Sequence, residues 1–412
     1  MSIALATQTE IRPVETSPTQ TSPIETSPIE TSPIETNPIE TNPARPAAEC
    51  AVELVSSYAG FVNLETEWNL AVERASISYP FLRHEWVRTW WDAFSTPGAR
   101  LHILVVRSAG AITAIAPFLR ETTSMYGVPT RRIRFIQNDH TPRTDIIVAD
   151  RPDESYRAIW RALRTDRDPW DVLQLSQLPP TSATRRAFSA CATADGCALG
   201  VWDGSASPYL TLSGTWDAYL QQLPAKFRSN LRNRIARLAP LGSPTLEVLA
   251  ERGAIDAGYP DACRLEASGW KRDAGTAITS EPAVHRFYTM LVERGAAAGW
   301  LRLLFLTVGG QRIATSYGAC FNNRLYLFKT GYDPAFATSA PFKLLTFHAI
   351  RDAYAQGLTE VDFLGDTEPW KLEWTSTIRG HDWLFIFGNT MRARLLHAIK
   401  FQWLPELKQW RA

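Results

Sequence analysis

This 412-residue chain has few cysteines, no long apolar run and no basic N-terminal segment. It has only five cysteines, an odd number without any Cys-x-x-Cys spacing, which argues against a disulfide framework or a zinc site and favours a reducing compartment. No apolar run reaches the roughly 18 residues of a membrane-spanning helix. The N-terminal stretch MSIALATQTE also lacks the basic start of a signal peptide. The sequence therefore predicts a cytoplasmic protein without a metal or a permanently bound cofactor.

The chain also lacks an excess of charge of either sign and the short motifs of several enzyme classes. Its 43 basic residues are balanced by 42 acidic residues, so no overall field favours nucleic acid, and we expect no nucleic-acid partner. There is no Gly-x-Ser-x-Gly, no Gly-x-x-x-x-Gly-Lys-Ser/Thr and no His-Glu-x-x-His. These absences argue against a serine hydrolase, a P-loop nucleotidase and a zinc peptidase.

A five-residue repeat, TSPIE and its variants, occupies the first part of the chain. Proline recurs at every fifth position from Pro13 to Pro43. This spacing prevents both a helix and a central strand, and the composition buries too little apolar surface to offset the entropy of ordering. We therefore expect residues 1–47 to be a disordered, partly extended spacer, with docking to a partner as the alternative.

The remaining sequence has the pattern of two α/β halves, at residues 48–214 and 215–390, with mixed sheets of the α+β kind. In the second half, a Gly309-Gly310 turn joins two apolar runs as in a β-hairpin. The expected elements there are three antiparallel strands, a helix ending at Gly357 and a returning strand, with the strands at 301–308, 313–321, 324–330 and 361–364. The hairpin expected at 101–120 has a similar pattern, which indicates that the two halves are related.

Four motifs of the second half resemble, in the same order, those of the CelD-like (cellulose-biosynthesis type) acetyltransferases of the GNAT superfamily. Fem-type transferases, which add amino acids to peptidoglycan precursors, are a more distant resemblance. The motifs are Lys226-Phe227-Arg228-x-x-Leu231-Arg232, Leu265-Glu266-x-x-x-Trp270-Lys271, Gly331-Tyr332-Asp333-Pro334-x-Phe336-Ala337 and Asp362-Phe363-Leu364-x-Asp366-x-x-x-x-Lys371-x-x-Trp374. The resemblance covers roughly residues 215–385 and implies tandem GNAT-like halves with acyl-CoA or acetyl-CoA as co-substrate.

In such folds the cofactor pyrophosphate binds at the start of the helix that follows the central strand. Free backbone N–H groups and the positive end of the helix dipole favour an anion there. The corresponding residues are Thr338, Ser339, Ala340, Phe342 and Lys343. We expect Ser339 to cap the helix, Pro341 to open it and Lys343 to add a cation. Phe342 replaces the small residue that is usual in the family.

The expected reaction needs a base that takes a proton from the attacking amine. Asp362 ends an apolar strand, where a carboxylate is costly unless it is paired. It is therefore either the general base or the structural partner of Lys371, and Asp366 is a further candidate. A second possibility is His140 with Asp145, whose spacing matches that of glycerolipid acyltransferases. Alternatively, this loop contacts substrate, with Arg143 as an anion anchor.

The remaining candidate substrate contacts come from the same motifs: Arg228, Glu266, Trp270, Lys271, Tyr332 and Trp374. Glu266 and Lys271 flank Trp270 at helical spacing, so they either orient an acceptor or form an ion pair at a helix end. Residues 391–412 form a basic amphipathic helix with Leu395, Leu396, Ile399, Trp403 and Leu407 on one face. This helix either lies on an anionic membrane on the inner face or packs on its own domain.

The sequence therefore predicts an acyl-CoA-dependent N-acyltransferase that acts on an amine of a cell-envelope component, either a polysaccharide or a sphingolipid-type lipid. Attack on the thioester would be direct, without a covalent enzyme intermediate. Two alternatives stay open. One is Fem-type transfer from an aminoacyl-tRNA, for which 228–237 is the basic segment. The other is a catalytically degenerate GNAT scaffold in an envelope synthase complex.

Deletion of residues 1–47 tests the interpretation of the repeat. Because the proline-rich segment is expected to bury little surface, the shortened chain should unfold at the same temperature as the full chain and turn over substrate equally well. The measurement is a thermal melt of both chains by circular dichroism. A fall of several degrees on deletion would show that the tail packs against the folded part.

Overall fold

The computed structural model describes residues 50–268, 275 and 277–404. The proline repeat, Trp270, Lys271 and residues 405–412 lie outside the described residues. All described elements belong to one compact unit, residues 48–412. In the described part no helix is long and apolar enough to cross a membrane.

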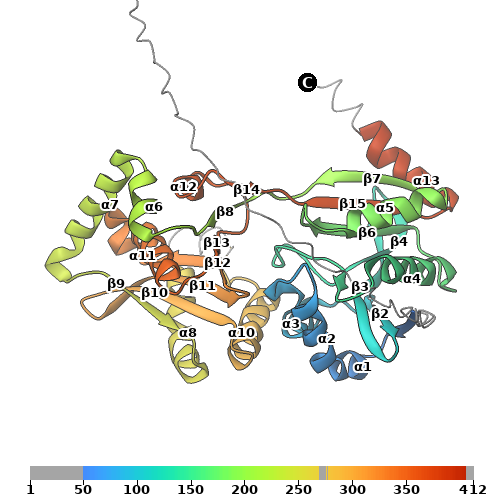
Figure 1. Ribbon diagram of the computed structural model, residues 1–412, viewed down its shortest axis with the longest axis horizontal. Coiled ribbons are helices and arrows are strands. Elements are labelled where there is room, and N and C mark those ends of the chain that lie inside the picture. The colour runs from blue at the N-terminus through green and yellow to red at the C-terminus, as the bar shows by residue number, and fades with distance from the viewer. Residues whose placement is uncertain (1–49, 269–274, 276, 405–412) are drawn as a thin grey trace, which may run out of the picture. The chain divides into compact units, whose positions relative to one another are not determined.

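The first sheet has eight strands, seven of them in the order β1-β2-β3-β4-β6-β15-β7, with β5 paired to β3 (Figure 1). Its strands are β1 (Ala51–Val55), β2 (Arg100–Ser108), β3 (Ala111–Met125), β4 (Val128–Phe135), β5 (Ile147–Val148), β6 (Val172–Leu178), β7 (Ala198–Asp203) and β15 (Asp382–Phe387). The helices of this half are α1 (Tyr58–Asn63), α2 (Glu65–Arg74), α3 (His84–Phe94), α4 (Pro152–Thr165) and α5 (Thr184–Ala194).

The second sheet has seven strands in the order β14-β8-β13-β12-β11-β10-β9. They are β8 (Ser207–Thr211), β9 (Thr245–Leu249), β10 (Leu301–Val308), β11 (Gln311–Phe321), β12 (Arg324–Tyr332), β13 (Glu360–Asp362) and β14 (Ile378–Arg379). The helices of this half are α6 (Trp216–Gln222), α7 (Ala225–Leu238), α8 (Arg252–Glu266), α10 (Pro282–Ala297), α11 (Pro341–Ala355) and α12 (Pro369–Leu372). The last helix, α13 (Met391–Ala398), packs on β15 and β7 of the first sheet.

The two sheets follow the same plan strand by strand. Each has four antiparallel strands, then a parallel neighbour, β6 or β13, that the chain reaches through α4 or α11. Each then accepts an antiparallel strand from the other part of the chain: β15 enters the first sheet and β8 enters the second. The mixed α/β class and the two related halves expected from the sequence are confirmed.

Local sequence explains the matching turns and helix starts. The hairpins turn at Ala109-Gly110 and Gly309-Gly310, where both residues of each pair have positive φ, as a tight hairpin requires. Both crossover helices begin in the same way, because Arg151 and Ala340 each adopt the left-handed conformation directly before a proline. The expected cap is therefore wrong: Ala340, not Ser339, is the N-cap of α11, and it makes no side-chain cap bond.

Two antiparallel segments run continuously from one sheet into the other. The segment of β7 and β8 pairs with that of β14 and β15, so that Asp382 lies opposite Asp203 and Ile378 lies opposite Pro208. The boundaries expected at 214/215 and 390/391 therefore divide the sequence but not the sheets. This exchange of β15 and β8 between the sheets is stabilised by backbone pairing. Each inserted strand covers a sheet edge that would otherwise expose unpaired backbone groups.

A common core also joins the halves. The helices α3 and α10 pack together, with the Trp86 and Phe287 rings 5.7 Å apart, and Arg294 donates to Asp92 over 2.7 Å. Trp86 and Phe287 are both buried in a cluster that contains residues of both halves. Burial of two such rings contributes about 1.5–3 kcal/mol each to folding.

The C-terminal helix differs from its expected form. The apolar face predicted for it is divided, because Leu396 is buried whereas Leu395 and Trp403 are 42% and 50% exposed. Lys400 is buried, with its ammonium 3.7 Å from the centre of the Trp202 ring. A π-helical segment, Ile399–Trp403, follows α13 and shifts the register of the residues after Ala398, among them Lys400 and Trp403.

Candidate active site

A cavity of about 490 Å³ lies where the two halves meet. Its size is typical of small-molecule sites, which span roughly 300–1,000 Å³. The second half contributes Tyr288 from α10, Phe328 and Lys329 from β12, and the turn 364–366 after β13. The first half contributes the loop 139–142, Trp86 and Gln177.

The cavity is produced by the divergence of β12 and β13. These parallel strands pair only from Arg324/Glu360 to Tyr326/Asp362, and β12 then continues to Tyr332 paired with β11 but not with β13. At the same point the register of β12 on β11 shifts, so that Phe328 and Lys329 bulge out of the ladder. The bulge separates the strands and turns backbone and side chains toward the cavity.

The first half places an equivalent turn on the same cavity. Gln177, near the end of β6, and Leu364, just after β13, both have positive φ although neither is glycine. Such conformations cost of order 1–3 kcal/mol and are found where a site fixes them. Gln177 follows the parallel pairing of β6 with β4, and Leu364 follows that of β13 with β12. The cavity therefore lies between two matching strand ends.

His140 faces this cavity, and its ring is held by aromatic neighbours. It stacks on Phe94 at 5.4 Å with an interplanar angle of 4°, and its Nδ1 lies 3.4 Å from the Tyr288 hydroxyl. Burial, followed by the charge of Lys329, lowers the pKa of His140 to about 4. His140 is therefore neutral near pH 7 and can act as a proton acceptor.

The dyad of His140 with Asp145 is not formed. In the described part of the chain no hydrogen bond or ion pair joins these two residues; the Asp145 carboxylate instead accepts from the Thr184 hydroxyl at 2.5 Å and the Ile146 amide at 2.8 Å. Burial raises the pKa of Asp145 to about 6. The structure thus separates a cavity histidine from a buried structural carboxylate.

Asp362 is the centre of a buried ion-pair network and not the partner of Lys371. Its Oδ2 lies 2.6 Å from a guanidinium nitrogen of Arg143 and 2.6 Å from one of Arg379, and its Oδ1 accepts from the Leu364 amide at 3.0 Å. Asp362 and Arg143 are both fully buried. Neither residue lines the cavity, so the structure supports neither Asp362 as general base nor Arg143 as an anion anchor for substrate.

The rest of this network comes from the crossing strands. Arg143 donates to the Ser207 hydroxyl at 3.0 Å and to Nε2 of His381 at 2.8 Å. Burial, followed by the charge of Arg143, lowers the pKa of His381 to about 4, so its neutral ring accepts at Nε2 and donates from Nδ1 to the Ser205 carbonyl. Arg379 also pairs with Glu360, and the two cations therefore face two carboxylates.

Lys371 holds the turn on which the cavity depends. Its ammonium donates to the carbonyl oxygens of Leu364 and Asp366 at 2.7 and 2.8 Å and pairs with Glu368 at 2.9 Å. Asp366 is exposed and lines the cavity. Of the three residues expected from the last motif, Asp366 faces the site, whereas Asp362 and Lys371 fix its wall.

The expected pyrophosphate site lies at the start of α11. Thr338 is exposed, and its carbonyl accepts from Arg237 of α7 at 2.6 Å; Ser339 is buried. The Phe342 ring packs edge-on against Trp370 at 4.7 Å, and Lys343 forms an ion pair with Glu373. A basic helix therefore lies beside the helix start.

The other predicted substrate contacts lie away from the cavity in the described structure. Glu266 is fully buried and accepts from the Ile278 amide at 2.8 Å, while Arg228 bonds to Gln221. Trp374 is buried against Phe227, and Tyr332 is 36% exposed at the end of β12. Trp270 and Lys271 lie outside the described residues.

Sequence reasoning missed Tyr288, Lys329, Arg379 and His381. Tyr288 lies on the apolar face of α10 and has no motif of its own. Lys329 is in the expected third strand, but the bulge that turns it toward the cavity has no clear sequence signal. Arg379 and His381 flank the strand crossing, so only their order before an apolar strand, Arg-Gly-His-Asp, could have drawn attention to them.

Replacement of Asp362 by Asn tests the buried network. The substitution leaves Arg143 and Arg379 without their shared carboxylate, and loss of one partner of a buried ion pair costs about 3–5 kcal/mol. The free energy of unfolding, measured in urea, should fall by this amount. Asp366→Asn is the matched control and should change it by less than about 0.5 kcal/mol, because Asp366 is exposed. Normal stability with lost turnover in Asp362→Asn would instead make Asp362 the base.

Two solved structures align with most of this chain. The FemX crystal structure aligns over 82% of this chain and 98% of its own, with a TM-score of 0.55 and 11% identity. A conserved protein of unknown function from Bacteroides thetaiotaomicron VPI-5482 aligns over 82% of this chain and 100% of its own, with a TM-score of 0.51 and 10% identity. Identities this low show similarity of fold alone. No curated protein sequence matches the chain.

A family model matches one segment of the chain. The model described as an acetyltransferase (GNAT) domain matches residues 225–372, which include α7, the bulged strand β12, the helix α11 and the turn at 364–366. The expected resemblance to the CelD-like family is confirmed for this segment. Residues 225–372 are therefore similar to a GNAT-type acetyltransferase domain.

Proposed function

We propose that the protein is an acyl-CoA-dependent N-acyltransferase whose reaction takes place in the cavity between its halves. The observation that carries this proposal is the divergence of β12 and β13 at Tyr326/Asp362, directly beside the cavity and inside the GNAT domain. An extended thioester arm can lie between separated strands and bond to their unpaired backbone groups, which a closed sheet would not allow.

The donor would bind to the second half only. The helix α11 has no acidic residue in its first turn, whereas the equivalent helix α4 carries Asp153 and Glu154 there. Carboxylates at a helix start oppose binding of an anion, while free N–H groups favour it. We therefore assign the pyrophosphate of acyl-CoA to the segment 338–343, with Arg237 and Lys343 as nearby cations.

His140 and Tyr288 would carry the protons. With Nδ1–H of His140 donating to the Tyr288 oxygen, Nε2 is free to accept a proton as the amine attacks the thioester carbonyl. Tyr288 then gives its hydroxyl proton to the leaving thiolate and recovers one from Nδ1 of the imidazolium. Burial raises the pKa of Tyr288, so its hydroxyl gives up its proton to the thiolate only as the imidazolium of His140 returns one to the same oxygen.

The acceptor would be an amine of a cell-envelope component. Asp139 and Asp366 are exposed carboxylates on the cavity lining, which favours approach of an ammonium group. The acceptor is either a polysaccharide amine or a long-chain amine of the sphingolipid type. An assay that offers both amines and identifies the acylated product distinguishes them. A Fem-type reaction with aminoacyl-tRNA would bring its anionic donor to the α7 arginines, and a degenerate scaffold would bind no donor.

His140→Gln and Tyr288→Phe test the proposed chemistry. Loss of the base should lower kcat by roughly two to four orders of magnitude, and Tyr288→Phe should lower it by somewhat less. Release of free thiol from acyl-CoA, followed with a panel of amines, gives the rate. Dissociation constants for acyl-CoA should stay within about twofold, because neither residue is assigned to the pyrophosphate site.

His285→Gln is the matched control, since His285 is exposed on the same helix as Tyr288. It should leave the rate unchanged. If His140→Gln turns over substrate at the wild-type rate, His140 is not the base and Asp366 becomes the candidate. If no acyl-CoA binds to the wild-type chain, the scaffold alternative holds; if aminoacyl-tRNA is the donor that reacts, the Fem-type alternative holds.

We further propose that α13 contacts an anionic membrane surface. Met391 is 88% exposed, Leu395 and Trp403 are also exposed, and Arg392 and Arg394 lie beside them. Apolar side chains flanked by arginines fit the boundary between lipid headgroups and acyl chains. This contact would bring the cavity close to an acceptor that is itself held in the membrane.

Arg392→Gln together with Arg394→Gln tests this contact. Sedimentation with liposomes should increase with the fraction of anionic lipid and decrease with salt for the wild type. The double variant should lose most of the binding, since each basic residue contributes about 1 kcal/mol near an anionic surface. Arg252→Gln, an exposed arginine at the start of α8, is the control. Binding that ignores both salt and these substitutions would contradict the proposal.

A further inference from the structure

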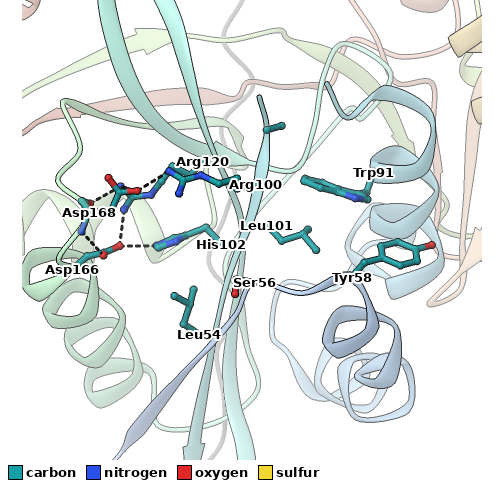
Figure 2. Close-up of a pocket in the computed structure, with 11 residues that line it drawn as sticks. Leu54, Ser56, Tyr58, Trp91, Arg100, Leu101, His102, Arg120, Asp166 and Asp168 are labelled. Atoms are coloured by element: carbon teal, nitrogen blue, oxygen red, sulfur yellow. Dashed lines mark hydrogen bonds and ion pairs between the residues drawn. The ribbon is translucent and has the colours of Figure 1, made fainter. Parts of the chain in front are cut away.

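A second cavity, of about 530 Å³, lies in the first half and shares no residue with the proposed active site. It opens where β1 ends at Val55 and leaves the first residues of β2, from Arg100 to His102, without a strand on that side. Figure 2 shows Asp166, Asp168 and Arg120 gathered on one side of it and Tyr58 and Trp91 on the other. The cavity thus has a polar side and an aromatic side.

The charges on the polar side are balanced. Arg120, only 4% exposed, donates to Asp166 at 2.6 Å, and Arg100 pairs with Asp168 at 2.6 Å. Burial, followed by the charge of Arg120, lowers the pKa of His102 to about 4, so the imidazole is neutral. Two cations and two carboxylates therefore cancel beside a neutral ring.

Two buried nitrogens on this side still have hydrogen-bonding capacity. Nε of Arg120 and Nε2 of His102 make no hydrogen bond to any described residue, and Nε2 of His102 is 3.5 Å from Asp166. A buried polar atom without a partner costs about 1–3 kcal/mol. Both atoms are enclosed by protein, so a ligand that supplies the missing partner and recovers this free energy must enter between these side chains and Asp166.

We propose that this cavity binds a neutral saccharide. A hydroxyl both donates and accepts, so it can bond to a carboxylate and to a guanidinium or imidazole nitrogen at the same time. The aromatic rings of Trp91 and Tyr58 on the lining offer apolar surface to the C–H groups of a sugar ring. A net anion would face two carboxylates and a net cation two guanidinium groups, so the charge balance selects a neutral polyhydroxylated ligand.

The test is calorimetric titration of the full chain with glucose, galactose, N-acetylglucosamine and cellobiose. Glucuronate and glucosamine serve as anionic and cationic counterparts of nearly equal size. At least one neutral sugar should bind saturably, and its charged counterparts should bind more weakly. Ser56→Trp places a bulky side chain at an exposed position on the cavity lining and should abolish binding.

His102→Phe keeps the ring and removes its hydrogen bonds; the affinity should fall roughly tenfold, which corresponds to about 1.4 kcal/mol. Ser280→Trp, at an exposed serine outside the cavity, should bind as the wild type does. Absence of saturable binding by every neutral sugar, equal or tighter binding of glucuronate or glucosamine, or unchanged binding in Ser56→Trp would overturn the proposal. The outcome is independent of acyl transfer, since no step of the titration uses acyl-CoA.

Discussion

The architecture depends on the buried ion pairs that Asp362 makes with Arg143 and Arg379. Arg143 comes from the first half, Asp362 ends the last parallel strand of the second sheet, and Arg379 lies on β14. Charges without water need partners at close range, so neither half can move without leaving a cation or a carboxylate unpaired. The same carboxylate accepts from the Leu364 amide and thereby sets the turn that lines the proposed active site.

The two halves have the same strand order but different surfaces at equivalent positions. Both crossover helices start with a left-handed residue and a proline, yet α4 carries acidic residues where α11 has none. We infer that one half keeps the donor site while the other supplies His140 and a wall of the cavity. The first half carries a cavity of its own, with balanced ion pairs and aromatic rings, where the proposed saccharide would bind.

Much of this fold could be predicted from local pattern. Paired glycines identified the hairpin of β10 and β11, and the apolar stripe with Gly357 identified α11, because these signals act over a few residues. The strand exchange could not be predicted, since β8 and β15 are short strands and nothing local specifies the sheet that accepts them. The predicted partner of Asp362 was wrong for the same reason. Lys371 is near Asp362 in the sequence, whereas Arg143 is near it only in the folded chain. His140 was found by a spacing with Asp145 that the structure does not use.

The central claim is that the acyl thioester lies between β12 and β13. A crystal structure with a non-hydrolysable acyl-CoA analogue, in which a methylene replaces the reacting thioester sulfur, tests it most directly. The account predicts that the acyl carbonyl lies in the cavity between Lys329 and the turn 364–366, within hydrogen-bonding reach of His140 or Tyr288, and that the pyrophosphate lies at the start of α11. An analogue bound at α4, or one whose acyl group lies outside this cavity, would contradict it.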